Sequence, residues 1–413
     1  MKILQINTTV NSGSTGRIAE DIGQVLLANG HQSYIAYGRG DRPSQSKLIK
    51  IGTKFDFYIH GLKTAIFDRH GFGSKNATKQ FIKRIDEIKP DLIALHNLHG
   101  YYINIEILFN YLSKKQVPVV WTLFDCWGFT GHCSYFDDIS CEKWKKQCFE
   151  CPKTKKYPSS YVIDNSKLNF NQKNKLFNSP VNLELIVHSK WLQVLVKKSF
   201  LKKYNTNHIF SGIDLKIFDI KKNDAFIKEK YKIVGSKIVL GVASIWDKRK
   251  GLDDFTLIQN ENNGDFQIVL VGLSDQQLQD LPNGIIGIKR TENTEELAAI
   301  YSMANVFVNP TYQDNFPTTN LEALACGTPV ITYNTGGSPE AIDEKTGIVV
   351  TKGNKQELTD AIKLILKNPK SFYQSNCRSR AVENFNKFDR YNDYLLIFED
   401  AIKKQKNITD VNL

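Results

Sequence analysis

Short runs of apolar, β-type residues alternate along this chain with longer segments of helical pattern, and this alternation restricts the fold more than any other feature. Several of the runs are apolar at almost every position, as strands buried on both faces of a parallel sheet are. Strands that alternate with helices build βα units, so the sequence predicts an α/β protein with parallel sheets. The expected strands are 2–7, 32–37, 92–96, 117–123 and 183–188 in the first half, and 238–243, 266–271, 285–288, 306–309 and 330–332 in the second.

The length of 413 residues exceeds what one hydrophobic core usually serves, so two domains are expected. The predicted boundary lies near residue 208, where a strand-like run gives way to a segment rich in Lys and Asp. We expect a first domain at 1–208, with a cysteine-containing loop at 126–157, and a second domain at 209–389. A last helix is expected from about Arg390 to Lys404, within 390–413.

The tract 308–342 is the most informative part of the chain. It carries Asp314 in a loop, then a short helix expected to open at Thr318 or Thr319, and a glycine, Gly327, placed as helix C-termini require. Thr319 and Glu322 have the spacing of a capping box. Two carboxylates therefore flank a helix N-terminus, whose free N–H groups attract phosphate.

This tract resembles the donor-binding motif of retaining family 4 glycosyltransferases, in which a carboxylate, seven residues and a glutamate hold a nucleotide-sugar. The resemblance implies that Asp314 contacts sugar hydroxyls and that Glu322 contacts ribose hydroxyls. It also implies that the backbone N–H groups of Phe316, Thr318 and Thr319 face the sugar and the diphosphate. The family usually has Glu at the first position, so the sugar stays open. The alternative is that Glu322 only completes a capping box and that Asp314 is a turn residue.

The resemblance covers nearly the whole chain and implies the GT-B fold, two Rossmann-like domains facing a cleft, with the last helix crossing back onto the first. It points to the branch that builds colanic-acid-like, capsular or other exopolysaccharide. Such an enzyme moves a hexose from a nucleoside diphosphate-sugar to a hydroxyl of a glycan, lipid-linked through a polyprenyl chain, with retained configuration. The donor phosphate would take the acceptor proton, so neither a protein nucleophile nor a catalytic metal is expected. The alternative is a nucleotide-sugar epimerase or another GT-B enzyme without a glycan acceptor.

A second candidate phosphate element, 243–252, follows a predicted strand and places Lys and Arg beside a glycine. Lys250 matches the lysine with which the resembling family neutralises the leaving diphosphate. The family's arginine falls on Ser244 here, so Arg249 is expected to stand in for it. Gly272, at the end of the strand 266–271, is also placed on the donor side. A solvated basic turn is the alternative.

A glycine-containing loop at 11–17 lies between the first strand and a helix expected to start near Ile18. Glycine allows a backbone to approach a ligand closely, and Gly16 is the candidate. The resemblance places this loop in the cleft, although many βα turns contain glycine without binding anything.

Two strand ends in the first half collect polar and aromatic side chains. The segment 96–102 carries two histidines and two tyrosines where α/β folds gather ligand groups, which suggests an acceptor site. Relatives have His-Asp where this chain has Phe124 and Asp125. Asp125 is expected to carry part of that histidine's work, or His132 to reach in from the loop; reduced or altered activity is the alternative.

Four cysteines, with seven, six and two residues between them, follow in the same loop. In a cytosolic chain this pattern favours a structural zinc site over disulfides. Free thiols in an acceptor loop, or disulfides in an exported protein, are the alternatives. The four residues are Cys133, Cys141, Cys148 and Cys151.

The net charge of +12 and the pI near 9.1 suggest an acidic partner surface, either anionic lipid or nucleic acid, or else only a solvated lysine-rich surface. Nucleic acid is disfavoured because no aromatic-basic motif or helix-turn-helix pattern is present. Without a long apolar run or a signal-peptide pattern, a cytoplasmic location is expected, with peripheral contact at the cytoplasmic membrane face. Candidate contacts are Lys143, Trp144, Lys145, Lys146, Lys197, Lys198, Phe200, Lys202 and Lys203.

Overall fold

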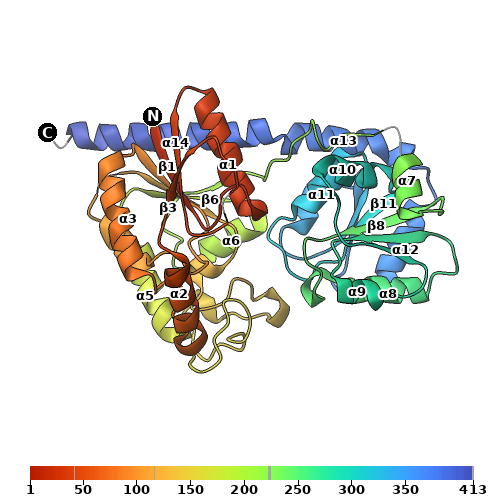
Figure 1. The fold of residues 1–413 in the computed structure, drawn as a ribbon, viewed down its shortest axis with the longest axis horizontal. Coiled ribbons are helices and arrows are strands. Elements are labelled where there is room, and N and C mark those ends of the chain that lie inside the picture. Colours follow the sequence, from red (N-terminus) through yellow and green to blue (C-terminus); the bar gives the residue numbers. More distant parts are fainter. Residues whose placement is uncertain (41, 116, 222–224, 412–413) are drawn as a thin grey trace. The chain divides into compact units, whose positions relative to one another are not determined.

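The computed structural model describes every residue except 41, 116, 222–224, 412 and 413, and it divides the chain into two compact units (Figure 1). The N-terminal unit comprises the chain up to Ile209 together with the residues from Tyr391 onward. The C-terminal unit is Phe210–Arg390. Each unit is described by itself below.

The N-terminal unit is built on a parallel sheet of seven strands in the order β3-β2-β1-β4-β5-β6-β7. The strands are β1 (Lys2–Asn7), β2 (Gln32–Tyr37), β3 (Lys47–Lys50), β4 (Leu92–Leu95), β5 (Val119–Leu123), β6 (Leu183–Val187) and β7 (Thr206–His208). The helices are α1 (Gly13–Ala28), α2 (Lys54–Phe67), α3 (Lys75–Ile88), α4 (Ile105–Leu112), α5 (Ser166–Phe177), α6 (Lys190–Lys198) and α14 (Lys387–Val411), the last entering this unit at Tyr391.

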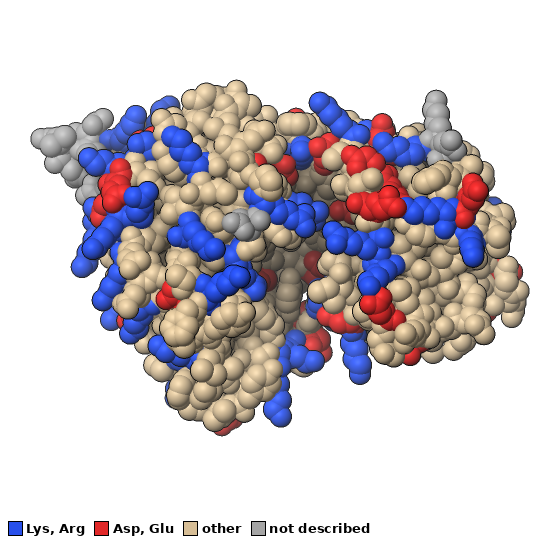
Figure 2. Space-filling view, viewed as in Figure 1, with Lys and Arg blue, Asp and Glu red and all other residues tan. Residues whose placement is uncertain are grey.

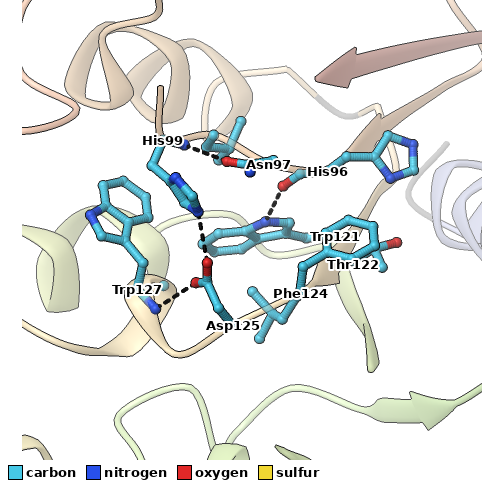
Figure 3. A pocket seen from close by; sticks show the side chains of 11 residues that line it. His96, Asn97, His99, Trp121, Thr122, Phe124, Asp125 and Trp127 are labelled. Atoms are coloured by element: carbon cyan, nitrogen blue, oxygen red, sulfur yellow. Dashed lines mark hydrogen bonds and ion pairs between the residues drawn. The ribbon is translucent and has the colours of Figure 1, made fainter. Parts of the chain in front are cut away.

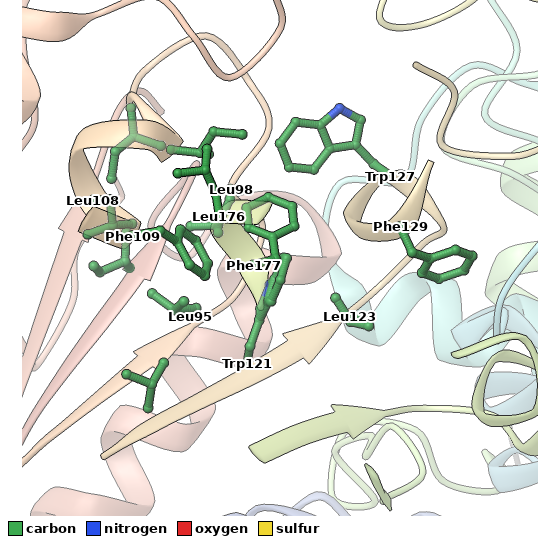
Figure 4. Packing of buried hydrophobic residues seen from close by; sticks show 14 of the residues in the cluster. Leu95, Leu98, Leu108, Phe109, Trp121, Leu123, Trp127, Phe129, Leu176 and Phe177 are labelled. Carbon is green, nitrogen blue, oxygen red and sulfur yellow. The ribbon is translucent and has the colours of Figure 1, made fainter. Parts of the chain in front are cut away.

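Both faces of this sheet are covered, which explains why its central strands are apolar on both sides. One face packs on α3, α4, α5 and α6, and Figure 4 shows the aromatic centre of that packing. The ring of Phe177 lies 4.6 Å from that of Phe109 and 4.8 Å from that of Trp121, centroid to centroid. The other face packs on α1 and α14, whose Tyr394 and Phe398 are fully buried.

The C-terminal unit has a parallel sheet of six strands in the order β10-β9-β8-β11-β12-β13. The strands are β8 (Ile238–Val242), β9 (Gln267–Val271), β10 (Ile285–Ile288), β11 (Val306–Asn309), β12 (Val330–Tyr333) and β13 (Gly347–Val350). The helices are α7 (Ala225–Tyr231), α8 (Leu252–Asn260), α9 (Asp275–Gln279), α10 (Thr294–Met303), α11 (Thr318–Ala325), α12 (Lys355–Ile365) and α13 (Ser371–Phe385). Helices α10 and α11 lie on one side of the sheet, and α8, α9 and α12 lie on the other (Figure 1).

The predicted α/β fold with parallel sheets is confirmed, and all ten predicted strands are present. The three strands that the sequence did not reveal, β3, β7 and β13, all lie at sheet edges. Most of their side chains are partly or fully exposed, so they lack the continuous apolar run that marks a central strand.

Several predicted helix starts differ from the structure. Helix α1 begins at Gly13 rather than near Ile18, so Gly16 lies inside the helix and not in the loop before it. Helix α11 begins at Thr318 as expected, but the capping box is wrong. Pro317 occupies the N-cap and no side chain caps the helix, because Thr319 already lies within the first turn.

Candidate functional site

The two phosphate-binding tracts predicted in the C-terminal unit meet at one ion pair. The Nζ atom of Lys250, at the end of the 3-10 helix η4 (Lys248–Lys250), lies 2.6 Å from Oδ2 of Asp314. Arg249 donates from Nη1 to the backbone carbonyl of Gln313 at 2.8 Å, and the same nitrogen lies 3.8 Å from Asp314 Oδ2. Two cationic groups and one carboxylate therefore converge beside the loop that leads into α11.

Backbone packing that only glycine permits holds these loops together. Gly251 follows η4 with φ of +75°, and a Cβ atom there would lie 2.2 Å from the carbonyl oxygen of Pro310. Gly336 has φ of +53°, and a Cβ atom there would lie 1.7 Å from the carbonyl oxygen of Asp314. Any larger residue would push the loops apart, so both glycines fix where Lys250 and Asp314 meet.

Glu322 lies in the second turn of α11 and is held by a buried tyrosine. Tyr301 donates from its hydroxyl to Oε2 of Glu322 at 3.0 Å. Burial, and next the charge of Glu322, raises the pKa of Tyr301 well above its usual value, so the phenol stays a donor. Helix α11 starts four residues earlier, and its first N–H groups, those of Thr318 and Thr319, have no partner inside the helix.

Two amides that sequence reasoning missed complete this region. Asn320 donates to the carbonyl and hydroxyl oxygens of Ser338 at 3.2 and 3.0 Å, and accepts from Asn309 at 2.8 Å. It thereby ties the start of α11 to the end of β11. Gln313, next to Asp314, is buried, and its Nε2 atom has no hydrogen-bond partner. A buried amide donor left open in this loop is a candidate ligand group.

The other glycines and Ser244 have less to offer a ligand. At Gly272 (φ +99°) a Cβ atom would lie 1.7 Å from the carbonyl oxygen of Ala243. At Gly16 it would lie 2.6 Å from the hydroxyl oxygen of Thr9. Contacts within the chain thus account for both glycines, and Ser244 is an exposed loop residue. Their ligand-binding roles stay predictions.

A separate group of polar side chains lies at the carboxyl ends of β4 and β5 in the N-terminal unit (Figure 3). Asp125 accepts at Oδ2 from Nε2 of His99 at 2.8 Å and at Oδ1 from the backbone N–H of Trp127 at 2.8 Å. The other ring nitrogen of His99, Nδ1, lies 2.9 Å from the hydroxyl of Tyr157. His99, Asp125 and Trp127 are part of the lining of a pocket formed by 96–99, 121–125, 127 and 128.

The direction of the hydrogen bonds follows from the carboxylate. A carboxylate oxygen accepts, so Nε2 of His99 donates to Asp125, and Nδ1 is the ring nitrogen that pairs with the hydroxyl of Tyr157. Burial first, and then Tyr101 and Asp125, raise the pKa of Tyr157 above its usual value, which keeps its hydroxyl protonated. Tyr157, His99 and Asp125 thus form one chain along which a proton can be held or moved.

Phe124 and His132 do not join this chain. The Phe124 ring lies between two buried histidines, 6.2 Å from His96 and 5.1 Å from His188 by ring centroids. The expectation that His132 reaches toward the strand ends is wrong. Its side chain is fully buried, with Nδ1 2.5 Å from Asp68 and Nε2 3.3 Å from the carbonyl oxygen of Lys156.

The cysteine loop does not show a ligand set for zinc. Cys133 and Cys151 share a thiol hydrogen bond, which is the main reason that the pKa of Cys151 is lowered to about 7, and Cys148 accepts from the N–H of Gly131 at 3.3 Å. All seven cysteines, which the structure describes, are free thiols. Among the described residues, no three His, Cys, Asp or Glu side chains are grouped to hold a metal ion. Zinc binding stays a prediction, tested by metal analysis of protein purified under reducing conditions.

The structure also changes which of the expected side chains could contact a membrane. Trp144 is buried, stacked 5.0 Å from the ring of Phe136, so it cannot contact lipid as expected. Lys143 is held by the carbonyl oxygens of Phe149 and Glu150. None of the helices in the described part of the chain combines the length and the apolarity needed to cross a bilayer.

Residues 236–368 match the family model described as glycosyl transferases group 1. The chain is 25% identical over 395 residues to the "Putative colanic acid biosynthesis glycosyl transferase WcaC" of Escherichia coli K12, covering 88% of this chain and 90% of that protein. The sucrose-phosphate synthase of Thermosynechococcus elongatus has a similar fold, with a TM-score of 0.70 at 18% identity over 97% of this chain and 99% of that one. The Anabaena protein Alr3699/HepE, solved in complex with UDP-glucose, has a TM-score of 0.67 at 15% identity, over 97% and 100% of the two chains.

Proposed function

We propose that this chain, a glycosyltransferase with the GT-B fold and a glycosyl transferases group 1 domain at residues 236–368, transfers a hexose from a nucleoside diphosphate-sugar. The acceptor is a hydroxyl of a lipid-linked glycan in surface polysaccharide synthesis, and the anomeric configuration is retained. The observation that carries the proposal is the meeting of Lys250, Arg249 and Asp314 beside the start of α11, with Glu322 on the same helix.

The donor half of this proposal follows from charge. A departing nucleoside diphosphate gains negative charge, and Lys250 and Arg249 are the cations placed to neutralise it. The backbone N–H groups of Phe316, just before α11, and of Thr318 and Thr319, at its start, add donors for phosphate oxygens. Glu322 binds ribose hydroxyls and Asp314 binds sugar hydroxyls. Because protein cations and helix N–H groups carry the stabilisation, the proposal needs no catalytic metal.

The acceptor half rests on His99 and Asp125. The family's histidine is replaced by Phe124, whose ring is packed between other histidines. His99, held by Asp125 at the neighbouring strand end, supplies an imidazole at the same sheet edge instead. We infer that the chain Tyr157–His99–Asp125 binds and orients the acceptor hydroxyl, while a donor phosphate oxygen takes its proton. These groups favour transfer over a nucleotide-sugar epimerase, which needs no second substrate site. The lipid-linked acceptor would bring the enzyme to the cytoplasmic membrane face.

The test is direct. Purified protein is incubated with a panel of nucleoside diphosphate-hexoses, with and without a polyprenyl diphosphate-linked glycan, and products are separated by mass. NMR of the new linkage reports whether the configuration is retained. Transfer that requires the glycan supports the proposal. Interconversion of the nucleotide-sugar itself, with no glycan consumed, would instead establish the epimerase.

A further inference from the structure

Helix α2 exposes an apolar stripe and buries two polar side chains on its opposite side. Phe55, Tyr58 and Leu62, spaced at i, i+3 and i+7, are 74%, 68% and 57% exposed. His60 and Thr64, on the opposite side of the helix, are fully buried. A helix at the surface of a soluble protein normally has the reverse arrangement, with its apolar stripe against the core.

Hydrogen bonds fix this rotation of the helix. Thr53 and Asp56 form a capping box at its start. In the buried face, Nε2 of His60 accepts from the backbone N–H groups of Gly71 and Gly73 at 3.1 and 3.2 Å. At Gly73 a Cβ atom would lie 2.3 Å from the His60 ring, so the two are closely packed. Turning the apolar stripe inward would break these contacts, so the exposure is built into the fold.

A second segment extends the apolar surface. The N–H of Tyr161 donates to the carbonyl of Ala65 at 2.8 Å, and that of Ile163 to Ile66 at 3.0 Å, so residues 161–163 lie along the end of α2. This segment is exposed as well, with Val162 at 72%. Contiguous apolar surfaces of this kind mark interaction sites. We name the combined surface the α2 face; it consists of Phe55, Tyr58, Ile59, Leu62, Phe67, Tyr161, Val162 and Ile163.

Lysines surround the α2 face. Lys54 and Lys63 are exposed on the helix itself, and Lys155 and Lys156 are exposed in the adjoining loop. Of the nearby acids, Asp56 is engaged by the capping box, and Asp164 accepts from the N–H groups of Cys151 and Ser166. Figure 2 shows an uncharged surface in the α2 region bordered by basic side chains.

We propose that the α2 face inserts into the headgroup region of an anionic bilayer. Aromatic and aliphatic side chains on an outward helix, flanked by lysines whose stems can extend to lipid phosphates, are the features of interfacial helices. The net charge of +12 favours an anionic surface. A second copy of this chain is a poorer occupant, since it would bring the same lysines against one another. The inference does not depend on the transfer reaction.

Sedimentation with vesicles of phosphatidylcholine, with or without phosphatidylglycerol, tests the proposal on the full chain. We expect binding to the anionic vesicles that falls about tenfold or more in the double variant Phe55→Ser, Leu62→Ser. The matched control, Phe226→Ser with Leu396→Ser, removes side chains of the same type that are 65% and 62% exposed elsewhere, and should bind as the unchanged protein does. Lys54→Gln with Lys63→Gln should reduce the preference for anionic over neutral vesicles.

A Tyr58→Trp variant locates the bound face. Its added fluorescence should be quenched by lipids brominated in the acyl chains if the α2 face inserts. Equal vesicle binding by the Phe55/Leu62 variant and the control, or no quenching, overturns the proposal. A dimer that the Phe55/Leu62 variant dissociates in sedimentation velocity, without vesicle binding, would assign the face to a second copy instead. Nucleotide affinity, measured alongside, separates this outcome from failure of the proposed function.

Discussion

The two units differ in how their candidate groups are brought together. In the C-terminal unit, the candidate groups lie in two short segments that follow the neighbouring strands β8 and β11. Lys250 and Arg249 lie in the first segment, and Asp314 and Glu322 lie within ten residues of each other in the second. In the N-terminal unit, Asp125 and Tyr157 are 26 and 58 residues from the histidine they contact. All eight histidines of the chain lie in the N-terminal unit, and the segment Phe210–Arg390 has none.

This difference assigns different chemistry to each unit. Fixed cations and a helix start suit a ligand that is anionic and gains further negative charge as it departs, as a diphosphate does. A partly buried imidazole between a carboxylate and a phenol suits a neutral hydroxyl that must be oriented. If the units divide the work in this way, variants in the C-terminal unit should affect the donor and variants in the N-terminal unit should affect the acceptor.

The largest effect is expected for Lys250→Ala. Because charge grows on the diphosphate as the sugar bond breaks, turnover should fall about 10²–10³-fold, with a smaller loss of donor affinity. Steady-state rates with saturating acceptor, beside calorimetric donor binding, measure both. Lys248→Ala, which removes an exposed lysine from the same 3-10 helix, is the control and should retain activity. Equal losses in both variants would mean that only general positive charge matters.

His99→Ala should lower kcat/KM for the acceptor by about 10²-fold and leave donor affinity unchanged. Asp125→Asn should have a similar effect, because Asn cannot hold the imidazole as the carboxylate does. In the double variant the losses should not add, since both residues act through one chain. A His99→Ala enzyme that binds the nucleotide-sugar poorly would refute the division between the units.

Glu322→Gln should weaken donor binding by about 1–3 kcal/mol, the cost of losing a charge-assisted hydrogen bond. Folding should be spared, because the Gln carbonyl can still accept from Tyr301. Calorimetric titration with the nucleoside diphosphate measures the first expectation, and thermal unfolding measures the second. Unchanged affinity in a folded variant removes Glu322 from the site.

The smallest effect is a difference in acid stability. Burial lowers the pKa of His60 and His96 to about 3 and that of His188 to about 4, against 6.5 in an unfolded chain. Between pH 6.5 and the lowered pKa values, these histidines bind protons in the unfolded state but not in the folded state. The stability that they contribute is therefore fully present above pH 6.5 and is lost as the pH falls toward 4. We expect the unfolding temperature of the N-terminal unit to be several degrees lower at pH 5 than at pH 7.5. Tryptophan fluorescence measures it, because this unit holds four of the five tryptophans. Hydrogen exchange that is accelerated equally in both units would contradict this.

The same contrast shows what the sequence could predict. The central strands, the loop of Asp314 and the glycine after α11 follow from local pattern, and the structure has them. The capping box failed on one residue, because Pro317 takes the N-cap position and has no side-chain acceptor. Both individual tracts around Lys250 and Asp314 were recognised, but their contact depends on strand order, which periodicity does not specify.

The N-terminal site was harder to predict for a physical reason. His99 appears in the sequence among other histidines and tyrosines, and nothing local marks it as the partner of Asp125. The outward apolar face of α2 was hidden for the same reason. The rotation of this helix about its axis is set by His60, which accepts hydrogen bonds from the N–H groups of Gly71 and Gly73, and both glycines lie beyond the helix. Side chains that owe their position to distant backbone groups leave no pattern in a single sequence.

Helix α14 is translated after both sheets, yet it belongs to the unit that is translated first. Tyr394 and Phe398 cover Ile3, Ala94 and Val120 on one face of the first sheet, although the second unit is synthesised before them. At ordinary rates of translation, ribosomes need about 10–40 s to add the intervening residues. During that time the first sheet keeps an apolar strip uncovered on the nascent chain. The first unit to be translated is therefore the last to be completed, and it is the part most in need of chaperones during synthesis.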